Sequence, residues 1–435
     1  MYRIADNSYD IEFGQELETN LSLIANKTIS DLIAEDNQNL LIFPSNIEDT
    51  EDRIGKERIL SLHNSKLTTG NIMGFIGVNN CELTIHSRFQ SADNDYFLHY
   101  MLQKVFAINI FDLKHSISNE SAFDFLLYLF PYYLKKALRQ GLYKEYHKKR
   151  YNDSNVKGSV DLNSHLRSNI PFSGKVAYSL REHSFNNKIT QLIRHTIEFI
   201  KQHKYAHGIL NVDAETQNCV NQIIQITPNF DYKQQGAVVK MNLKAFSHPY
   251  YFEYQPLKKI CMQILRYEGL MYGDEKDKIY GLLFDGAWLW EEYLNTFLVK
   301  CGFKHPQNKK SNGAIYLFKG SRGQRYPDFY KENFILDAKY KRLDWKNADI
   351  LDRNDMNQII SYMYVQKALI GGFVYPSTNN ELPVTKKNIG ILNGYGGEVN
   401  TWALSIPQQV DTFTDFCFQM QDRENKMVEL INNDN

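Results

Sequence analysis

Apolar residues recur at helical spacing through the middle of the chain. In residues 186–203, NNKITQLIRHTIEFIKQH, one helical stripe collects five aliphatic side chains: Ile189, Leu192, Ile193, Ile197 and Ile200. This spacing indicates a helix that packs one face against a core. The same period occurs in residues 123–150, 214–227 and 256–270. We therefore expect residues 95–265 to form a mainly helical region.

The first part of the chain has a different period. Residues 72–89, IMGFIGVNNCELTIHSRF, alternate in the manner of strands that bury one face. This alternation predicts a small β-rich N-terminal domain over residues 1–94.

The last third of the chain mixes the two periods. The predicted elements are a helix at 287–303, a strand at 314–320, a strand-turn-strand at 325–341, a helix at 355–369, and strands at 371–376 and 400–408. This order indicates an α/β domain with a central mixed sheet over residues 266–435. The fold class is then α+β, with several domains.

Composition narrows the class of protein. The 435 residues are 43% hydrophobic, which is enough to build more than one core. Lys+Arg and Asp+Glu are 50 each, so any basic surface has to be local. The five cysteines form no C-x-x-C pair, and neither a signal peptide nor an apolar run of membrane-spanning length is apparent. We expect a cytoplasmic protein with no membrane partner.

The stretch YPDFYKENFILDAKYK, residues 326–341, holds the candidate chemistry. Alternation along its second strand places Asp337 and Lys339 on the same face as Ile335. The short turn before this strand would fold Asp328 back toward Asp337. Two neighbouring carboxylates repel each other unless a cation lies between them. Mg²⁺ is suited to one or two carboxylates and a backbone carbonyl, here that of Ala338.

A structural interpretation of the same residues is also open. Charged residues that alternate on an edge strand protect a sheet from aggregation, and D-x-K is a common tripeptide. The flanking helices favour a site, because they bring further polar side chains. Glu291 and Glu292 precede the sheet, and Gln358 and Tyr362 lie at i, i+4 on one helix face.

Helix-Glu, strand-Pro-Asp, strand-Asp-x-Lys and helix-Gln-x-x-x-Tyr, in this order, resembles the core of the PD-(D/E)xK nucleases. More narrowly, residues 70–410 resemble McrC subunits of McrBC 5-methylcytosine restriction systems and their LlaJI-type relatives. The stretches that carry this resemblance are GFIGVNNCELTIHSRF, GLYKEYHKKRYNDSNVKGSVDL, VAYSLREHSFNNKITQLIRHTIEFI, LFDGAWLWEEYL, YPDF, FILDAKYK and NQIISYMY.

The resemblance implies a role for each site residue. It makes Asp328, Asp337 and Glu291 metal ligands, Lys339 the catalytic lysine, and Gln358 and Tyr362 supporting residues. Glu291 is preferred to Glu292 because the family has an aromatic-Glu-x-Tyr pattern, which Trp290 and Tyr293 complete here. The implied activity is a Mg²⁺-dependent endodeoxyribonuclease in which Mn²⁺ can replace Mg²⁺.

The resemblance also implies partners. The sequence contains no G-x-x-x-x-G-K-[ST] loop, so we expect this chain to bind no nucleotide. An McrB-like AAA+ ring would bind GTP and move double-stranded DNA, while this chain cuts the DNA and stimulates the GTPase. Cutting both strands would require two nuclease domains or two whole complexes to meet.

Two basic clusters are candidate contacts for DNA or for the ring. Lys148, Lys149 and Arg150 lie among tyrosines in residues 143–159, a composition that fits a nucleic-acid backbone, an acidic protein face or simply a solvated helix end. The second cluster, which precedes the candidate site, consists of Lys319, Arg322 and Arg325.

Two other functions fit the same sequence. One is a non-catalytic adaptor that activates the AAA+ ring, and the other is a stand-alone DNA repair nuclease.

Overall fold

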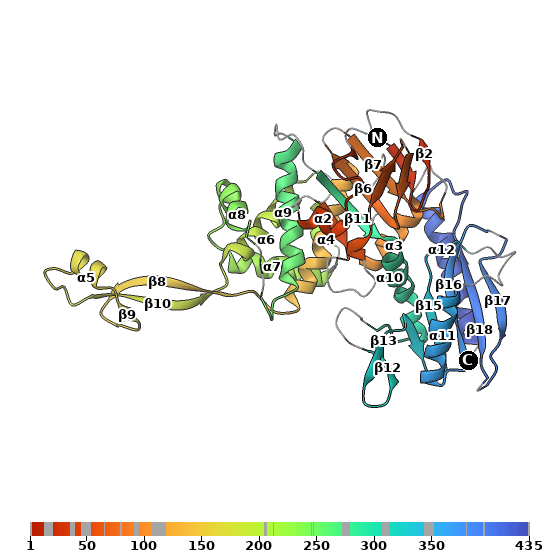
Figure 1. The fold of residues 1–435 in the computed structure, drawn as a ribbon. Helices are drawn as coiled ribbons and strands as arrows, with labels where there is room; N and C mark the ends of the chain where they lie inside the picture. Colours follow the sequence, from red (N-terminus) through yellow and green to blue (C-terminus); the bar gives the residue numbers. More distant parts are fainter. Residues whose placement is uncertain are drawn as a thin grey trace. The chain divides into compact units, whose positions relative to one another are not determined.

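The fold was analysed in a computed structural model (Figure 1). The described residues are 2–12, 21–34, 40–44, 54–64, 66–78, 81–90, 95–106, 119–203, 207–211, 213–244, 246, 248–271, 279–306, 313–342, 352–379, 381–394 and 396–433. The chain divides into two compact units, of which one comprises Met1–Ile110 with Glu275–Asn435 and the other comprises Phe111–Asp274. The N-terminal and C-terminal parts of the chain therefore fold together.

A five-stranded sheet joins these two parts within the first unit. Its strands, in spatial order, are β1 (Tyr2–Ala5), β7 (Cys81–His86), β6 (Ile72–Val78), β11 (Ile279–Asp285) and β3 (Leu40–Phe43). Strand β11 comes from the C-terminal part, yet it pairs antiparallel with β6 and parallel with β3. Its Leu283 is fully buried in the same core as Ile76 and Leu83. A small antiparallel sheet of β2 (Ile11–Glu12), β5 (Lys66–Thr69) and β4 (Leu60–His63) completes this region.

The second five-stranded sheet of this unit is mixed, as predicted. Its order is β14 (Phe329–Lys331), β15 (Phe334–Ala338), β16 (Ile370–Ser377), β18 (Glu398–Ser405) and β17 (Val384–Ile391). Strands β15, β16 and β18 are parallel, and the two edge strands are antiparallel to their neighbours. Helix α11 (Arg353–Gln366) packs Ile359 and Met363 against Ile335 and Phe373. A two-stranded ribbon, β12 (Ile315–Phe318) and β13 (Arg322–Arg325), precedes the sheet.

The described part of this unit also contains a short helix, α2 (Ile29–Ala34), and three further long ones. The long helices are α3 (Tyr96–Phe106), α10 (Gly286–Leu298) and α12 (Phe413–Asn433). Glu424 of α12 holds them together, since its Oε1 accepts hydrogen bonds from the hydroxyls of Tyr100 and Tyr293, both at 2.8 Å. Lys104 Nζ lies 2.8 Å from the other oxygen of Glu424 and balances its charge. A buried carboxylate with these partners fixes how α10 lies against its neighbours.

The second unit is mainly helical, in agreement with the sequence pattern. Its longer helices are α4 (Asn119–Leu138), α6 (Lys188–Gln202), α7 (Ala214–Ile226), α8 (Gln235–Met241) and α9 (Tyr254–Met271). The stripe predicted on α6 is buried, with Leu192, Ile193, Ile197 and Ile200 fully inaccessible to solvent. Asn187 caps this helix by accepting hydrogen bonds from the backbone of Ile189 and Thr190.

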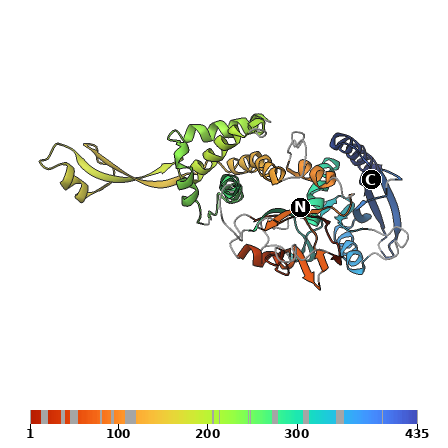
Figure 2. The same cartoon turned by 90° about the horizontal axis from the view of Figure 1, so that it is seen from above.

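A long hairpin extends from the helices of this unit (Figures 1 and 2). Strand β8 (Glu145–Asp153) pairs antiparallel over its whole length with β10 (Val176–Ser184), and the short strand β9 (Ser159–Val160) pairs with β10. Helix α5 (Leu162–Ser168) lies between β9 and β10 in sequence, begins at the cap Asp161, and has no buried residue. The interpretation of residues 143–159 as a solvated helix end is therefore wrong. Pairing with a segment more than twenty residues later decides the conformation of this polar stretch.

The predicted elements of the last third of the chain are largely confirmed, since each of them overlaps an observed element of the same type: α10, β12, β14, β15, α11, β16 and β18. Strands β13 and β17 and helix α12 were not predicted. The two compact units also do not follow the three predicted segments 1–94, 95–265 and 266–435. Among the described residues, no helix combines the length and the apolar character needed to cross a membrane.

The position of β11 leads to a prediction about chain fragments. A fragment of residues 1–94 lacks the strand that pairs with both β6 and β3, so we expect it to show no cooperative thermal unfolding by circular dichroism. A matched fragment of residues 111–274, which keeps all the strands of its own sheet, is expected to unfold cooperatively. A cooperative transition in the 1–94 fragment would contradict the dependence on β11.

Candidate active site

The hairpin formed by β14 and β15 brings Asp328 beside Asp337. Phe329 pairs with Leu336, so Asp328 and Asp337 occupy the next opposite positions along the ladder. The backbone N–H of Ala338 donates to Asp328 Oδ2 at 2.6 Å. Asn333 completes the turn with a left-handed backbone, φ 60°, which asparagine tolerates better than most residues. The turn chemistry thus sets the distance between the two carboxylates, as the sequence predicted.

Asp337 is buried and Asp328 is half-buried. Burial, followed by the charges of Asp337 and Glu291, raises the pKa of Asp328 well above its ordinary value. Burial is also the main cause of the raised pKa of Asp337, of which 2% is exposed. Placing both negative charges here is unfavourable unless a cation or a shared proton compensates them.

Lys339 lies on the same face of the strand as Asp337, as the alternation predicted. Its Nζ lies 2.6 Å from Asp337 Oδ2 and 3.1 Å from Oδ1 of Asp355. Burial lowers the pKa of Lys339, but the charges of Asp337, Asp328 and Asp355 outweigh it and raise the pKa above the ordinary value. The lysine therefore carries its positive charge at the site.

Sequence reasoning missed Asp355. It stands in the first turn of α11, where Asp352 caps the helix, and its Oδ2 lies 2.8 Å from Lys341 Nζ. Asp355 therefore links two lysines of the strand end to the helix that carries Gln358. The signal that could have found it is its position three residues before Gln358, on the same helix face.

Glu291 of α10 is brought toward the hairpin through His305, which sequence reasoning also missed. The Nδ1 of His305 donates to the carbonyl of Asp328 at 2.8 Å, and the ring stacks on Phe329 with centroids 5.0 Å apart. Glu291 Oε1 lies 3.7 Å from Nδ1, and Glu292 Oε1 lies 3.8 Å from Nε2. Both glutamates contact the imidazole, but Glu291 is the one whose charge acts on Asp328.

Gln358 and Tyr362 are on α11, next to the carboxylates of Asp328 and Asp337. Gln358 Nε2 donates to the hydroxyl of Tyr362 at 3.0 Å. Burial raises the pKa of Tyr362, the Gln358 hydrogen bond lowers it, and the charges of Asp337 and Asp328 raise it further. The predicted helix face therefore does lie along the site.

The two predicted basic clusters lie on different units. Lys319, Arg322 and Arg325 are exposed on the β12–β13 ribbon, and the charge of Arg325 reaches Tyr362. Lys148, Lys149 and Arg150 are exposed on β8 of the second unit. Each of the last two has an acidic neighbour: Lys149 lies 3.1 Å from Glu182, and Arg150 lies 3.6 Å from Asp161.

Asp328 and Asp337 are the candidate ligands for a divalent cation. Within the described part of the chain, no group of three or more His, Cys, Asp or Glu side chains is arranged to hold a metal ion. Two carboxylates with nearby backbone carbonyls are nevertheless a set that Mg²⁺ accepts, because it keeps several of its waters. Asp337 Oδ2 is buried, and its partner is the ammonium of Lys339 at 2.6 Å. Asp328 and Asp337 thus offer two oxygen ligands of the kind that a hard divalent cation takes.

The fold and site define a multidomain α/β protein with two neighbouring carboxylates and a lysine at the ends of two paired strands of a mixed sheet. Residues 67–376 match a family described as McrBC 5-methylcytosine restriction system component, and the chain belongs to this family. No curated protein sequence matches the chain significantly.

Two solved structures from Thermococcus gammatolerans are similar to this chain. One is a refined half-complex from a tetradecameric assembly of McrB AAA+ hexamers with bound McrC, with 14% identity, a TM-score of 0.46, and coverage of 97% of this chain and 99% of the other. The second is a cryo-EM structure of the McrBC complex, with 13% identity, a TM-score of 0.34, and coverage of 70% and 89%.

The carboxylate pair makes a testable prediction about stability. Asp328→Asn removes one buried charge while its side-chain oxygen can still accept from Ala338. We expect the variant to melt a few degrees higher than the wild type in EDTA, because the repulsion from Asp337 is gone. Differential scanning fluorimetry in EDTA and in excess Mg²⁺ measures this difference, which should shrink or reverse with Mg²⁺ if a metal is bound here. A variant less stable than wild type in EDTA would contradict the prediction.

Proposed function

We propose that this chain is the metal-dependent endodeoxyribonuclease subunit of a McrBC-like restriction complex. The observation that carries the proposal is the buried arrangement of Asp328, Asp337 and Lys339. The McrBC family describes components of a restriction system, and cleavage of DNA is the chemistry that this group of side chains suits.

Each side chain has a task in phosphodiester hydrolysis. When bound, Mg²⁺ supplies a Lewis acid that withdraws charge from the phosphate and acidifies water. Asp328 and Asp337 hold it, and Glu291 adds negative charge on the α10 side. Lys339 orients the attacking water and offsets the negative charge that develops on the phosphate oxygens. Water oxygen bonds to phosphorus, the bond from phosphorus to one sugar oxygen breaks, and that oxygen leaves with a proton.

Lys339 has two carboxylate partners. Its Nζ lies 2.6 Å from Asp337 and 3.1 Å from Asp355. Asp355 would therefore still hold the lysine if Asp337 bound a cation. Gln358 and Tyr362 keep the α11 face of the site polar without adding a charge.

Substrate and partner contacts are divided between the two units in this proposal. The exposed Lys319, Arg322 and Arg325 bind the phosphates of double-stranded DNA close to the site. The extended β8–β10 hairpin, with Lys148, Lys149 and Arg150, docks on an McrB-like AAA+ ring that binds GTP. The subunit works in the cytoplasm, and two such subunits or complexes meet to cut both strands.

A pair of lysine variants tests the catalytic assignment. With the AAA+ partner, GTP, Mg²⁺ and target DNA, Lys339→Ala is expected to reduce the cleavage rate about 100-fold or more, and Asp337→Asn to do the same. Lys341→Ala is the matched control, since that lysine pairs with Asp355 at the surface, and it should cleave nearly as wild type. All three variants should still stimulate the partner's GTPase.

The outcomes separate the rival functions. Wild-type cleavage by Lys339→Ala and Asp337→Asn would indicate that these charges are structural, as in a non-catalytic adaptor. Efficient cleavage by the wild type without partner or GTP would indicate a stand-alone repair nuclease.

The docking role of the hairpin has its own test. Reversing three charges in Lys148→Glu, Lys149→Glu and Arg150→Glu is expected to weaken binding to the ring and to reduce GTPase stimulation about tenfold, with a steep dependence on salt. Lys240→Glu, an exposed lysine on α8 of the same unit, is the control. Equal GTPase stimulation by both variants would rule out this basic cluster as the docking contact, and loss of DNA binding alone would assign it to DNA.

A further inference from the structure

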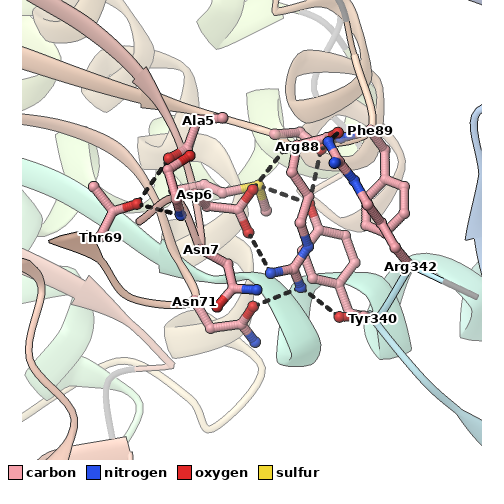
Figure 3. A network of polar contacts seen from close by, with 12 residues as sticks. Ala5, Asp6, Asn7, Thr69, Asn71, Arg88, Phe89, Tyr340 and Arg342 are labelled. Carbon is pink, nitrogen blue, oxygen red and sulfur yellow. Dashed lines mark hydrogen bonds and ion pairs between the residues drawn. The ribbon is translucent and has the colours of Figure 1, made fainter. Parts of the chain in front are cut away.

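Arg88 lies directly after β7 and is anchored in the N-terminal sheet. Its backbone N–H donates to Asp6 Oδ1 at 2.6 Å, and one guanidinium nitrogen lies 3.5 Å from Asp6 Oδ2 (Figure 3). Asp6 is completely buried, and only 7% of the Arg88 side chain is exposed. Asn71 also accepts a hydrogen bond from this guanidinium, at 2.8 Å. Contacts with Asp6 and Asn71 therefore hold the Arg88 side chain within the N-terminal region.

The other contacts of Arg88 are with the end of the strand that carries the candidate site. Its guanidinium donates to the carbonyl of Tyr340 and lies 4.7 Å from the centre of the Tyr340 ring. The carbonyl of Arg88 accepts from Arg342 at 2.7 Å. The Tyr340 hydroxyl lies 2.7 Å from Ser87 Oγ. Residues 340 and 342 follow immediately after Lys339, so these contacts fix the chain at the point where the site ends.

The same contacts reach helix α10, which carries Glu291. Gly286 begins this helix, and its backbone N–H donates to the carbonyl of Asn71 at 2.8 Å. A Cβ at Gly286 would lie 2.7 Å from the Tyr340 ring, so only glycine lets the helix begin this close. Asn71, Arg88 and Tyr340 therefore connect the N-terminal sheet to both elements that supply the site.

We propose that Arg88 is a positioning residue for Asp337 and Lys339, and that the N-terminal sheet serves as a brace for the catalytic strand. Strand β15 is fixed along its length by β16, and Lys339 N–H still donates to Val374 at 2.9 Å. After Lys339, the contacts of Arg88 with Tyr340 and Arg342 hold the chain. A planar guanidinium can bond Asn71 and the Tyr340 carbonyl and stack on the ring at once, which a lysine cannot do.

The catalytic consequence of this brace rests on the proposed function. A site of this kind tolerates displacements of roughly 0.5 Å, and about 1 Å can cost 100-fold in rate. Loss of the Arg88 guanidinium should therefore lower the metal affinity and the turnover rate. It should also reduce the local order of the chain at the end of β15.

The test compares Arg88→Lys with Thr69→Val in the full-length chain. Lysine keeps a positive charge beside Asp6 but loses the contacts to Tyr340. Thr69 is a matched buried polar residue whose hydroxyl bonds Ala5 and Ser8, within the N-terminal region alone. Hydrogen–deuterium exchange of the peptide covering residues 334–342 is measured without metal, and Mg²⁺ binding is measured by calorimetry.

We expect Arg88→Lys to exchange about tenfold faster in this peptide and to need about tenfold more Mg²⁺ for half-saturation. Thr69→Val is expected to match the wild type in both measurements, even if it melts at a lower temperature. Wild-type exchange in Arg88→Lys, or an equal increase in Thr69→Val, would overturn the brace.

A second variant covers the case in which Arg88→Lys does not fold. Asn71→Ala keeps Arg88 but removes the side-chain oxygen that accepts a hydrogen bond from its guanidinium. Faster exchange over residues 334–342 is again expected, and wild-type exchange would overturn the proposal. If the wild type itself neither binds Mg²⁺ nor cuts DNA, the proposed function fails, while the exchange measurements still decide whether the brace exists.

Discussion

The close approach of two carboxylates is the constraint on which the candidate site depends. Asp328 and Asp337 are held beside each other by a two-strand ladder and a tight turn, and burial raises the pKa of both. Lys339 compensates their charge directly, and the Ala338 N–H donates to Asp328, whereas Glu291 and Asp355 add further negative charge. A cation between the two carboxylates would offset this repulsion.

The path of the chain explains how this place is kept rigid. Strand β11 leaves the N-terminal sheet at Asp285, whose side chain caps the helix that carries Glu291. The N-terminal sheet therefore sets where that helix begins, and Arg88, which follows β7, contacts the chain just after β15. Residues before position 90 thus contribute to the geometry of a site more than two hundred residues away.

The second unit is stabilised by different interactions. Its helices bury an aliphatic stripe, whereas the β8–β10 hairpin leaves most of its side chains exposed or half-buried and is held chiefly by its own ladder. Charged and aromatic side chains that cannot be buried within one hairpin remain available to a partner. In the proposed function, chemistry and docking belong to separate compact units of the chain.

Local patterns in the amino-acid sequence were sufficient to predict the helical stripe of α6, the mixed order of the last third, and the shared face of Asp337 and Lys339. These features depend on periods of 3.6 and 2, which neighbouring residues set by themselves. Strand β8, the insertion of β11 between β6 and β3, and the contacts of Asp355, His305 and Arg88 were decided only by the tertiary structure. Each of them requires residues distant in sequence to meet, and a linear pattern of polar and apolar positions does not specify which distant segments pair or which buried charges find each other.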